Sequence, residues 1–192
     1  AIEEEEWRRM EEIIHSDDPS AYLGVVVENY PRNRSTYPFC TNCGGSSIAI
    51  CYGEATLADE AIYGEGAFFK SNIEEVTIGA NTKFGLGAFQ NCAKLTKVNM
   101  PKANVEFGRG CFAYCSNLGT IDLSYVEMIP EECFYSCSNL LRVNLANCKE
   151  IGNYAFSDCA KIVSVLVPKI EKIGEGAFSR YSTLGGAPIF TQ

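Results

Sequence analysis

Hydrophobic residues recur along the last two thirds of this chain with a period of about 22 residues. The clearest marker is a phenylalanine, at intervals of 21, 23, 22, 22 and 22 residues. The six positions are Phe68, Phe89, Phe112, Phe134, Phe156 and Phe178. A fixed period of this length is typical of a repeat array, in which each unit buries its apolar face against the next unit.

Each unit contains two kinds of apolar spacing, counted from its phenylalanine as position zero. In most units a small residue or cysteine at +3 and a Leu or Ile at +6 have the spacing of a helical turn or 3₁₀ segment. The first unit is one residue short, with Ile73 as the equivalent of +6, and the last has Tyr181 at +3. Apolar residues at +9 and +11, such as Val98 and Met100, have the alternation of a strand. The pattern predicts an α/β solenoid, a right-handed superhelix. Short parallel strands would lie on one face and 3₁₀ or helical turns and loops on the other.

The domain organisation follows from where this pattern begins and ends. Residues 1–38 are predicted to form an N-terminal acidic helix and cap, and residues 39–192 the array. Within the array we expect a degenerate first repeat at 39–67, regular repeats at 68–184 and a weak terminal strand at 185–192.

The predicted capping helix covers Ile2–His15. Its apolar residues Trp7, Met10, Ile13 and Ile14 lie at helical spacing in a charged stretch. A polar-faced helix on the first coil would close the open end of the array. The sequence shows no second cap at the other end. We therefore expect either that the last short strand blunts that edge or that the array continues in a longer parent protein.

Three segments carry a family resemblance: GAFQNCAKLTKVNMP at 87–101, YAFSDCAKIVSVLVP at 154–168 and IEKIGEGAF at 170–178. They resemble leucine-rich repeats of the BspA-like type, over about residues 60–184. Cys111 and Cys133 depart from the pattern, in which Ala usually precedes the phenylalanine. The resemblance implies a leucine-rich-repeat fold and a cell-surface or secreted location, often with a role in adhesion.

The charge of the chain is concentrated at its N-terminus. The formal net charge is −8, of which residues 1–18 carry −6. The remaining 174 residues hold 16 acidic and 14 basic side chains, so the array offers no basic stripe for nucleic acid. No apolar run approaches the length of a membrane-spanning helix, so we expect no membrane insertion.

Six of the ten cysteines follow the repeat. Cys92, Cys115, Cys137 and Cys159 fall at +3, where Ser71 also fits, and Cys111 and Cys133 replace alanine. A position that accepts small residues of different chemistry favours packing, so these six are predicted to be buried free thiols in a cysteine ladder.

The other four cysteines, Cys40, Cys43, Cys51 and Cys148, lie outside this register. A local disulfide, simple packing, a redox pair and half of a zinc site remain open for them. The chain has one histidine, His15, and a single Cys-x-x-Cys, which disfavours zinc. No nucleophile and base pair or phosphate-binding loop is recognisable, so we expect no enzyme activity, catalytic residue, metal or cofactor.

The residues that alternate with the buried strand positions are predicted to point outward on the concave face of the sheet. They are polar and mixed in sign, which suits a moderate-affinity contact with a protein or glycan. The predicted partner-binding residues are Glu75, Thr77, Lys97, Asn99, Thr120, Asp122, Arg142, Asn144 and Ser164.

Three functions remain open at this point. The first is a non-enzymatic ligand-binding or adhesion module at the cell surface or in a secreted protein. The second is a structural spacer of a longer surface protein. The third is an intracellular, cytoplasmic scaffolding protein with buried thiols. The sequence favours a monomer and does not identify the ligand.

Overall fold

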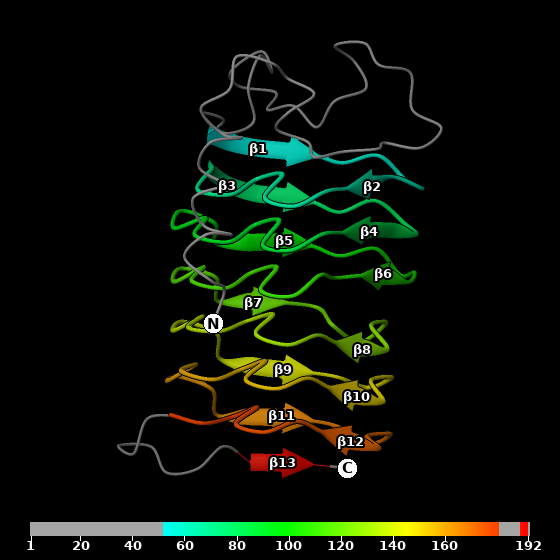
Figure 1. Cartoon of the computed structure of the whole chain (residues 1–192), viewed down its shortest axis with the longest axis vertical. Helices are drawn as coiled ribbons and strands as arrows, with labels where there is room; N and C mark the ends of the chain where they lie inside the picture. The colour runs from blue at the N-terminus through cyan, green and yellow to red at the C-terminus, as the bar shows by residue number, and fades with distance from the viewer. Residues whose placement is uncertain (1–51, 181–188, 192) are drawn as a thin grey trace.

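The computed structural model describes residues 52–180 and 189–191, and every regular element in them is a strand. The strands stack as successive coils of a solenoid, in two columns that run the length of the described array (Figure 1). All pairings between neighbouring coils are parallel.

The first column contains the longer strands. It consists of β1 (Tyr52–Thr56), β3 (Asn72–Thr77), β5 (Lys97–Asn99), β7 (Thr120–Ile121), β9 (Arg142–Asn144), β11 (Ser164–Leu166) and β13 (Ile189–Thr191). Their hydrogen bonds form two sheets, β1-β3-β5-β7 and β9-β11-β13. From β5 to β11 the strands include the +9 position of each unit, as the alternation predicted. In the last pairing Phe190, at +12, lies opposite Val165.

The second column lies on the other side of the coils and contains strands of two or three residues. It consists of β2 (Ile62–Tyr63), β4 (Thr82–Phe84), β6 (Val105–Glu106), β8 (Met128–Ile129), β10 (Glu150–Ile151) and β12 (Lys172–Ile173). These also form two sheets, β2-β4-β6 and β8-β10-β12. The sequence pattern predicted strands on one face of the coils only, so this second column was not foreseen.

The phenylalanine rings form a continuous stack behind the first column. Phe68, Phe89, Phe112, Phe134 and Phe156 are at most 1% exposed. Consecutive rings from Phe68 to Phe178 lie 4.6–5.3 Å apart, with interplanar angles of 1–8°. The coil-to-coil spacing of the strands therefore matches the spacing of stacked aromatic rings.

The segment around each phenylalanine consists of turns, so the predicted 3₁₀ or helical segment is not confirmed. Every second backbone amide in this segment donates to a carbonyl of the next coil; Phe89 N, for example, donates to Cys111 O at 2.8 Å. The amides between them donate within their own coil, as Gln90 N does to Gly87 O. The residues at −2 and +2 have positive φ in every unit, for example Gly87 at 58° and Asn91 at 58°. Positive φ at these positions interrupts a right-handed helix.

The predicted buried thiols lie beside the aromatic stack. Cys92, Cys111, Cys115, Cys133, Cys137 and Cys159 are buried free thiols, as is Cys148. At +3, each thiol donates to the carbonyl of an earlier phenylalanine at 3.0–3.1 Å; one example is Cys115 Sγ to Phe89 O. The Cys148 thiol donates to Glu150 O at 3.2 Å.

Several sequence predictions fall outside the described residues. These are the capping helix, residues 39–51 of the predicted degenerate repeat, and the cysteines Cys40, Cys43 and Cys51. Of the predicted degenerate repeat, the structure describes β1 and β2, and β1 pairs with β3. In the predicted terminal segment 185–192, β13 pairs with β11.

Candidate functional site

The outward-facing residues of the first column are set by strand alternation. In β5 and β9 the central Val98 and Val143 are buried and their flanking residues are not. Parallel pairing then aligns equivalent side chains across the coils, since Glu75 pairs with Lys97 and Lys97 with Thr120. The nine predicted binding residues accordingly occupy two rows that cross β3, β5, β7, β9 and β11.

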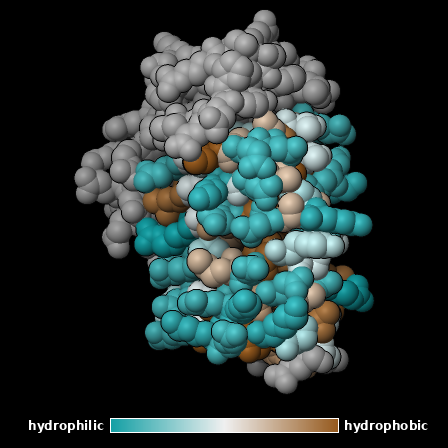
Figure 2. Space-filling model, turned by 90° about the vertical axis from the view of Figure 1, so that its right-hand side faces the viewer, coloured by the Kyte–Doolittle hydropathy of each residue, from teal (hydrophilic) through white to brown (hydrophobic). Residues whose placement is uncertain are grey.

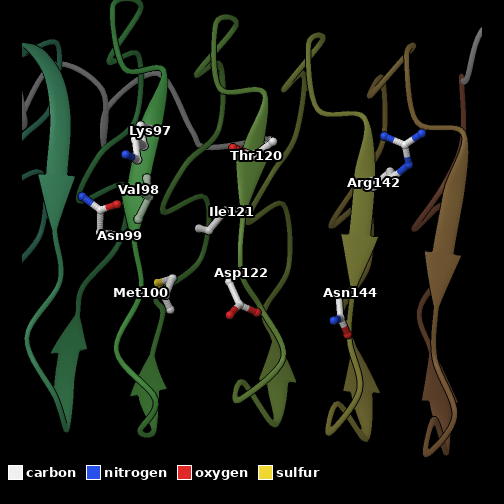
Figure 3. A pocket seen from close by; sticks show the side chains of 9 residues that line it. All are labelled: Lys97, Val98, Asn99, Met100, Thr120, Ile121, Asp122, Arg142 and Asn144. Atoms are coloured by element: carbon white, nitrogen blue, oxygen red, sulfur yellow. The ribbon is translucent and has the colours of Figure 1, made fainter.

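A hollow of about 540 Å³ lies in these rows, and we call it the sheet hollow. Its lining residues are Lys97, Val98, Asn99, Met100, Thr120, Ile121, Asp122, Arg142 and Asn144. Figure 3 shows that they come from β5, β7 and β9 and the residues that follow β5 and β7, with Lys97, Thr120 and Arg142 near one end of the strands. Six of the nine predicted residues line the hollow. Glu75, Thr77 and Ser164 lie on the adjoining strands.

The sheet hollow coincides with a break in the first column. β7 ends the sheet β1-β3-β5-β7, and β9 begins the next one. Among the described residues, Leu141 N to Gly119 O at 3.4 Å is the one backbone hydrogen bond that joins these two coils near the break. The interrupted pairing leaves the surface between β7 and β9 more open than a continuous ladder would.

One side of the sheet hollow is closed by an internal polar network. The Lys97 ammonium lies 3.5 Å from Glu75 Oε1, and the Asn99 amide donates to Glu75 Oε1 at 2.8 Å and to Thr77 Oγ1 at 3.1 Å. The Asn99 hydrogen bond, with a smaller contribution from Lys97, lowers the pKa of Glu75 below its usual value. Glu75 therefore stays ionised and continues to engage Lys97.

Arg142 differs from Lys97 in having no such partner. Its side chain is exposed, and no carboxylate of the described residues lies within 4.0 Å of its guanidinium. Its ladder partner in β11 is Ser164, which is uncharged. Arg142 is thus a cation of the sheet hollow whose donors are not engaged by a described acid.

Asp122 and Asn144 are held by their own backbones. Asp122 Oδ1 accepts from Ser124 N at 3.0 Å, and Asn144 Oδ1 accepts from Ala146 N at 3.1 Å. Each is a local side-chain bond of the kind that fixes Asx residues at turns. Asp122 retains its second carboxylate oxygen as an acceptor, and Asn144 retains its amide hydrogens as donors.

Sequence reasoning missed two features of this site. Met100, half-buried beside the hollow, was assigned to the strand core because it occupies +11. The break between β7 and β9 was also not foreseen, because the repeat pattern continues through it without a gap. The one irregularity nearby is the 23-residue interval between Phe89 and Phe112.

The second column has a different surface. Its outward side chains include the ion pairs Lys83 with Glu106 and Lys172 with Glu150, each at 3.5 Å. Figure 2, which looks at the right-hand side of Figure 1, shows a mainly hydrophilic face with scattered hydrophobic residues. The charges of these two described pairs neutralise one another, in contrast to Arg142.

The thiols offer no chemistry at this surface. Burial raises the pKa of Cys115 and of Cys159 to about 12, so both remain protonated near neutral pH. No cluster of three or more His, Cys, Asp or Glu suited to a metal ion occurs in residues 52–180 and 189–191. In the same part of the chain, no helix has the length and apolar character needed to cross a membrane.

Comparison with known proteins places this geometry in a family. The model of the BspA type leucine-rich-repeat region matches residues 61–185 in six copies. No curated protein matches the sequence.

Two solved structures share the fold. A leucine-rich-repeat protein of T. pallidum has 23% identity and a TM-score of 0.51, with 64% of this chain and 74% of that chain covered. A leucine-rich-repeat protein of Bacteroides ovatus has 22% identity and a TM-score of 0.53, with 68% and 41% covered. The family model covers well over half of the sequence, and its repeats correspond to the coils seen here. The chain belongs to the BspA-type leucine-rich-repeat family.

Proposed function

We propose that this protein is a non-enzymatic ligand-binding or adhesion module that contacts a protein or glycan through the polar rows of its first strand column. The observation that carries this proposal is the sheet hollow, lined by six of the nine residues predicted to face outward. Solenoid proteins commonly bind through the extended face that repetition creates.

The chemistry of the rows supports binding rather than catalysis. Lys97, Asp122 and Arg142 supply both signs of charge, and Asn99 and Asn144 supply neutral hydrogen-bonding groups. Their positions are fixed by strand pairing and by local hydrogen bonds, so little side-chain freedom is lost when a ligand binds. A surface of this kind favours many directional contacts of moderate strength.

Membership of the BspA-type family supports a cell-surface or secreted location, where a rigid, polar binding face would meet host or matrix molecules. A structural spacer in a longer surface protein is the second candidate. It is favoured by the exposed apolar residues of the last described coil, with Ile173 49% and Phe190 47% exposed.

A binding array tests the proposal. The purified protein is applied to an array of immobilised glycans and purified extracellular-matrix proteins, and bound protein is detected with a tag. The test variant replaces Lys97, Asp122 and Arg142 by Ala. The matched control variant replaces the exposed Lys83, Glu106 and Glu150 of the second column by Ala.

We expect the wild type and the control to bind the same spots and the test variant to lose at least tenfold in signal. Thermal unfolding of all three proteins should agree within a few degrees, because exposed side chains contribute little to stability. If the test variant binds as the wild type does, or the wild type binds nothing, the proposal is overturned.

A further inference from the structure

Some hydrogen-bonding groups of the sheet hollow already have partners within the protein, and others do not. The groups without such a partner indicate which class of ligand the hollow can bind. Lys97 is held by Glu75 at 3.5 Å, and the Asn99 amide is used by Glu75 and Thr77. At the β9 side, Arg142 has no acid among the described residues within 4.0 Å. The donors of Lys97 and Asn99 therefore already have acceptors within the protein, whereas the Arg142 guanidinium is available to bind an anion.

Arginine is well suited to one kind of anion. Its guanidinium presents parallel N–H groups that match the two oxygens of a carboxylate, and such bidentate pairs are among the stronger hydrogen-bonded contacts. Thr120 and Ser164 are the nearest outward residues in the same row and carry hydroxyl groups, so neither competes with the ligand as an acid would.

The other row supplies partners for hydroxyl groups. Asn144 is two residues from Arg142 on β9, about 6.6 Å along the strand. Its Oδ1 is used by Ala146 N, so its amide hydrogens are free to donate. Asp122, across the break, has one oxygen on Ser124 N and a second oxygen left to accept. Figure 3 shows Asp122 and Asn144 on neighbouring coils at the same level of the strands.

Large apolar anchors are missing from the hollow. Val98 and Ile121 are only 5% and 6% exposed, and Met100 is half-buried. The strongest contacts of protein interfaces are usually large, exposed apolar side chains that insert into pockets of the partner. The described lining of the hollow has no side chain that is both large and apolar and fully exposed. Its volume of about 540 Å³ falls within the roughly 300–1,000 Å³ typical of small-molecule sites, which accommodates a sugar ring.

We infer that the sheet hollow binds an acidic sugar residue of a glycan, with the carboxylate on Arg142 and ring hydroxyls on Asp122 and Asn144. This inference rests on the proposed binding function and specifies its ligand class. The sugar is a uronic or a sialic acid, since both carry a carboxylate next to several hydroxyl groups.

Isothermal titration calorimetry with defined oligosaccharides tests the inference. The acidic probes are tetragalacturonate and sialyllactose. Their neutral counterparts are the methyl esters of tetragalacturonate and of sialyllactose, which keep the hydroxyl groups and mask the carboxylate. We expect at least one acidic probe to bind about tenfold or more tightly than its neutral counterpart, and to weaken as salt is raised.

Variants assign the contact to Arg142. Arg142→Gln should weaken the bound acidic probe about tenfold or more, since hydrogen bonds to charged groups are lost. Lys83→Gln is the matched control, because Lys83 lies on the second column and pairs with Glu106 at 3.5 Å, and it should change affinity less than threefold. Asp122→Asn should weaken the acidic probe and its neutral counterpart by a similar factor, because it affects hydroxyl recognition.

The outcomes separate this inference from the proposed function. The inference is overturned if neither acidic probe binds, if neutral probes bind equally well, if Arg142→Gln has no effect, or if a polyglutamate peptide binds as tightly as the sugars. If the array experiment still shows binding that depends on the first column, the proposed function survives without the acidic sugar. If the array experiment also fails, both are wrong.

Discussion

Two coils of this array have almost the same motif and differ in how well their apolar residues are covered. Ile151, Gly152 and Phe156 belong to an interior coil, where both apolar residues are at most 1% exposed. Ile173, Gly174 and Phe178 belong to the last coil described before residue 181, where Ile173 is 49% exposed and Phe178 is only partly buried.

The arrangement of rings changes between these coils in the same way. Phe156 lies between Phe134 and Phe178, parallel to both, at interplanar angles of 2° and 5°. Phe178 has one parallel neighbour and meets Phe190 edge-on at 85°. Burial in this fold is therefore supplied by neighbouring coils on both sides and not by a coil's own sequence, as expected for a quasi-one-dimensional array.

The largest effect is expected for a substitution at the centre of the phenylalanine stack. Phe134→Ala should lower the free energy of unfolding by about 3–5 kcal/mol, because a fully buried ring is removed and a cavity remains. Phe178→Ala should cost less than half as much, because that ring is only partly buried and meets Phe190 edge-on in place of a second parallel ring. Urea unfolding followed by circular dichroism measures both. Equal costs for the two variants would contradict the comparison.

A second experiment tests whether the coil of Gly174 packs against the coil before it as closely as an interior coil does. A Cβ on Gly152 would lie 2.5 Å from Glu131 N, and one on Gly174 would lie 2.5 Å from Asn153 N. Gly152→Ala and Gly174→Ala should therefore both destabilise, by roughly 1–3 kcal/mol each.

Gly119→Ala is the matched control for these glycines. Its Cβ would meet nothing closer than Asn139 O at 4.0 Å, so the change should be close to neutral. The same urea titrations apply. If Gly174→Ala were as mild as Gly119→Ala, this coil would pack loosely against the coil before it, and the close fit inferred from the contacts of Gly174 would be wrong.

A further prediction is a pH dependence from a buried thiol of an interior coil. Burial raises the pKa of Cys115 from 9.0 to about 12, so the folded protein holds this proton while the unfolded chain releases it. The stabilisation is complete below pH 9 and is lost as the pH rises towards 12, by roughly 1 kcal/mol per pH unit.

Cys115→Ser isolates this contribution, and Ser71 shows that the equivalent position of another coil accepts serine. The stability difference between wild type and Cys115→Ser should narrow by roughly 1 kcal/mol per pH unit above pH 9, measured by urea unfolding under reducing conditions. A constant difference from pH 8 to pH 11 would show that Cys115 is accessible to water in the folded protein.

Much of the fold could be predicted because the period itself encodes it. The recurrence of Phe68 through Phe178 predicted a buried axial stack, and the alternation around Val98 predicted which strand residues face outward. The conformation of the turns was harder to predict from the sequence. Positive φ at +2 falls on Asn91 and other residues that are not glycine, so nothing in the composition indicated that a helix is interrupted there.

The candidate site could be predicted only as two rows of residues. Alternation identified Lys97, Asp122 and Arg142 as outward-facing. The repeat places Glu75 next to Lys97 and Ser164 next to Arg142, as the strand pairing has them. It could not show that the Lys97 and Glu75 side chains approach to 3.5 Å, because that depends on side-chain conformation. The break between β7 and β9 arises from pairing between coils, which the residues of one unit do not determine.

The parallel stacking of coils has a mechanical consequence. The ladder hydrogen bonds run along the long axis of the array, from β1 at one end to β13 at the other (Figure 1). A force applied between the two ends would load these bonds one coil at a time, so the protein would unzip in steps rather than shear as a block. Each step would release about 22 residues, roughly 75 Å of extended chain, which would make the molecule an extensible tether under tension.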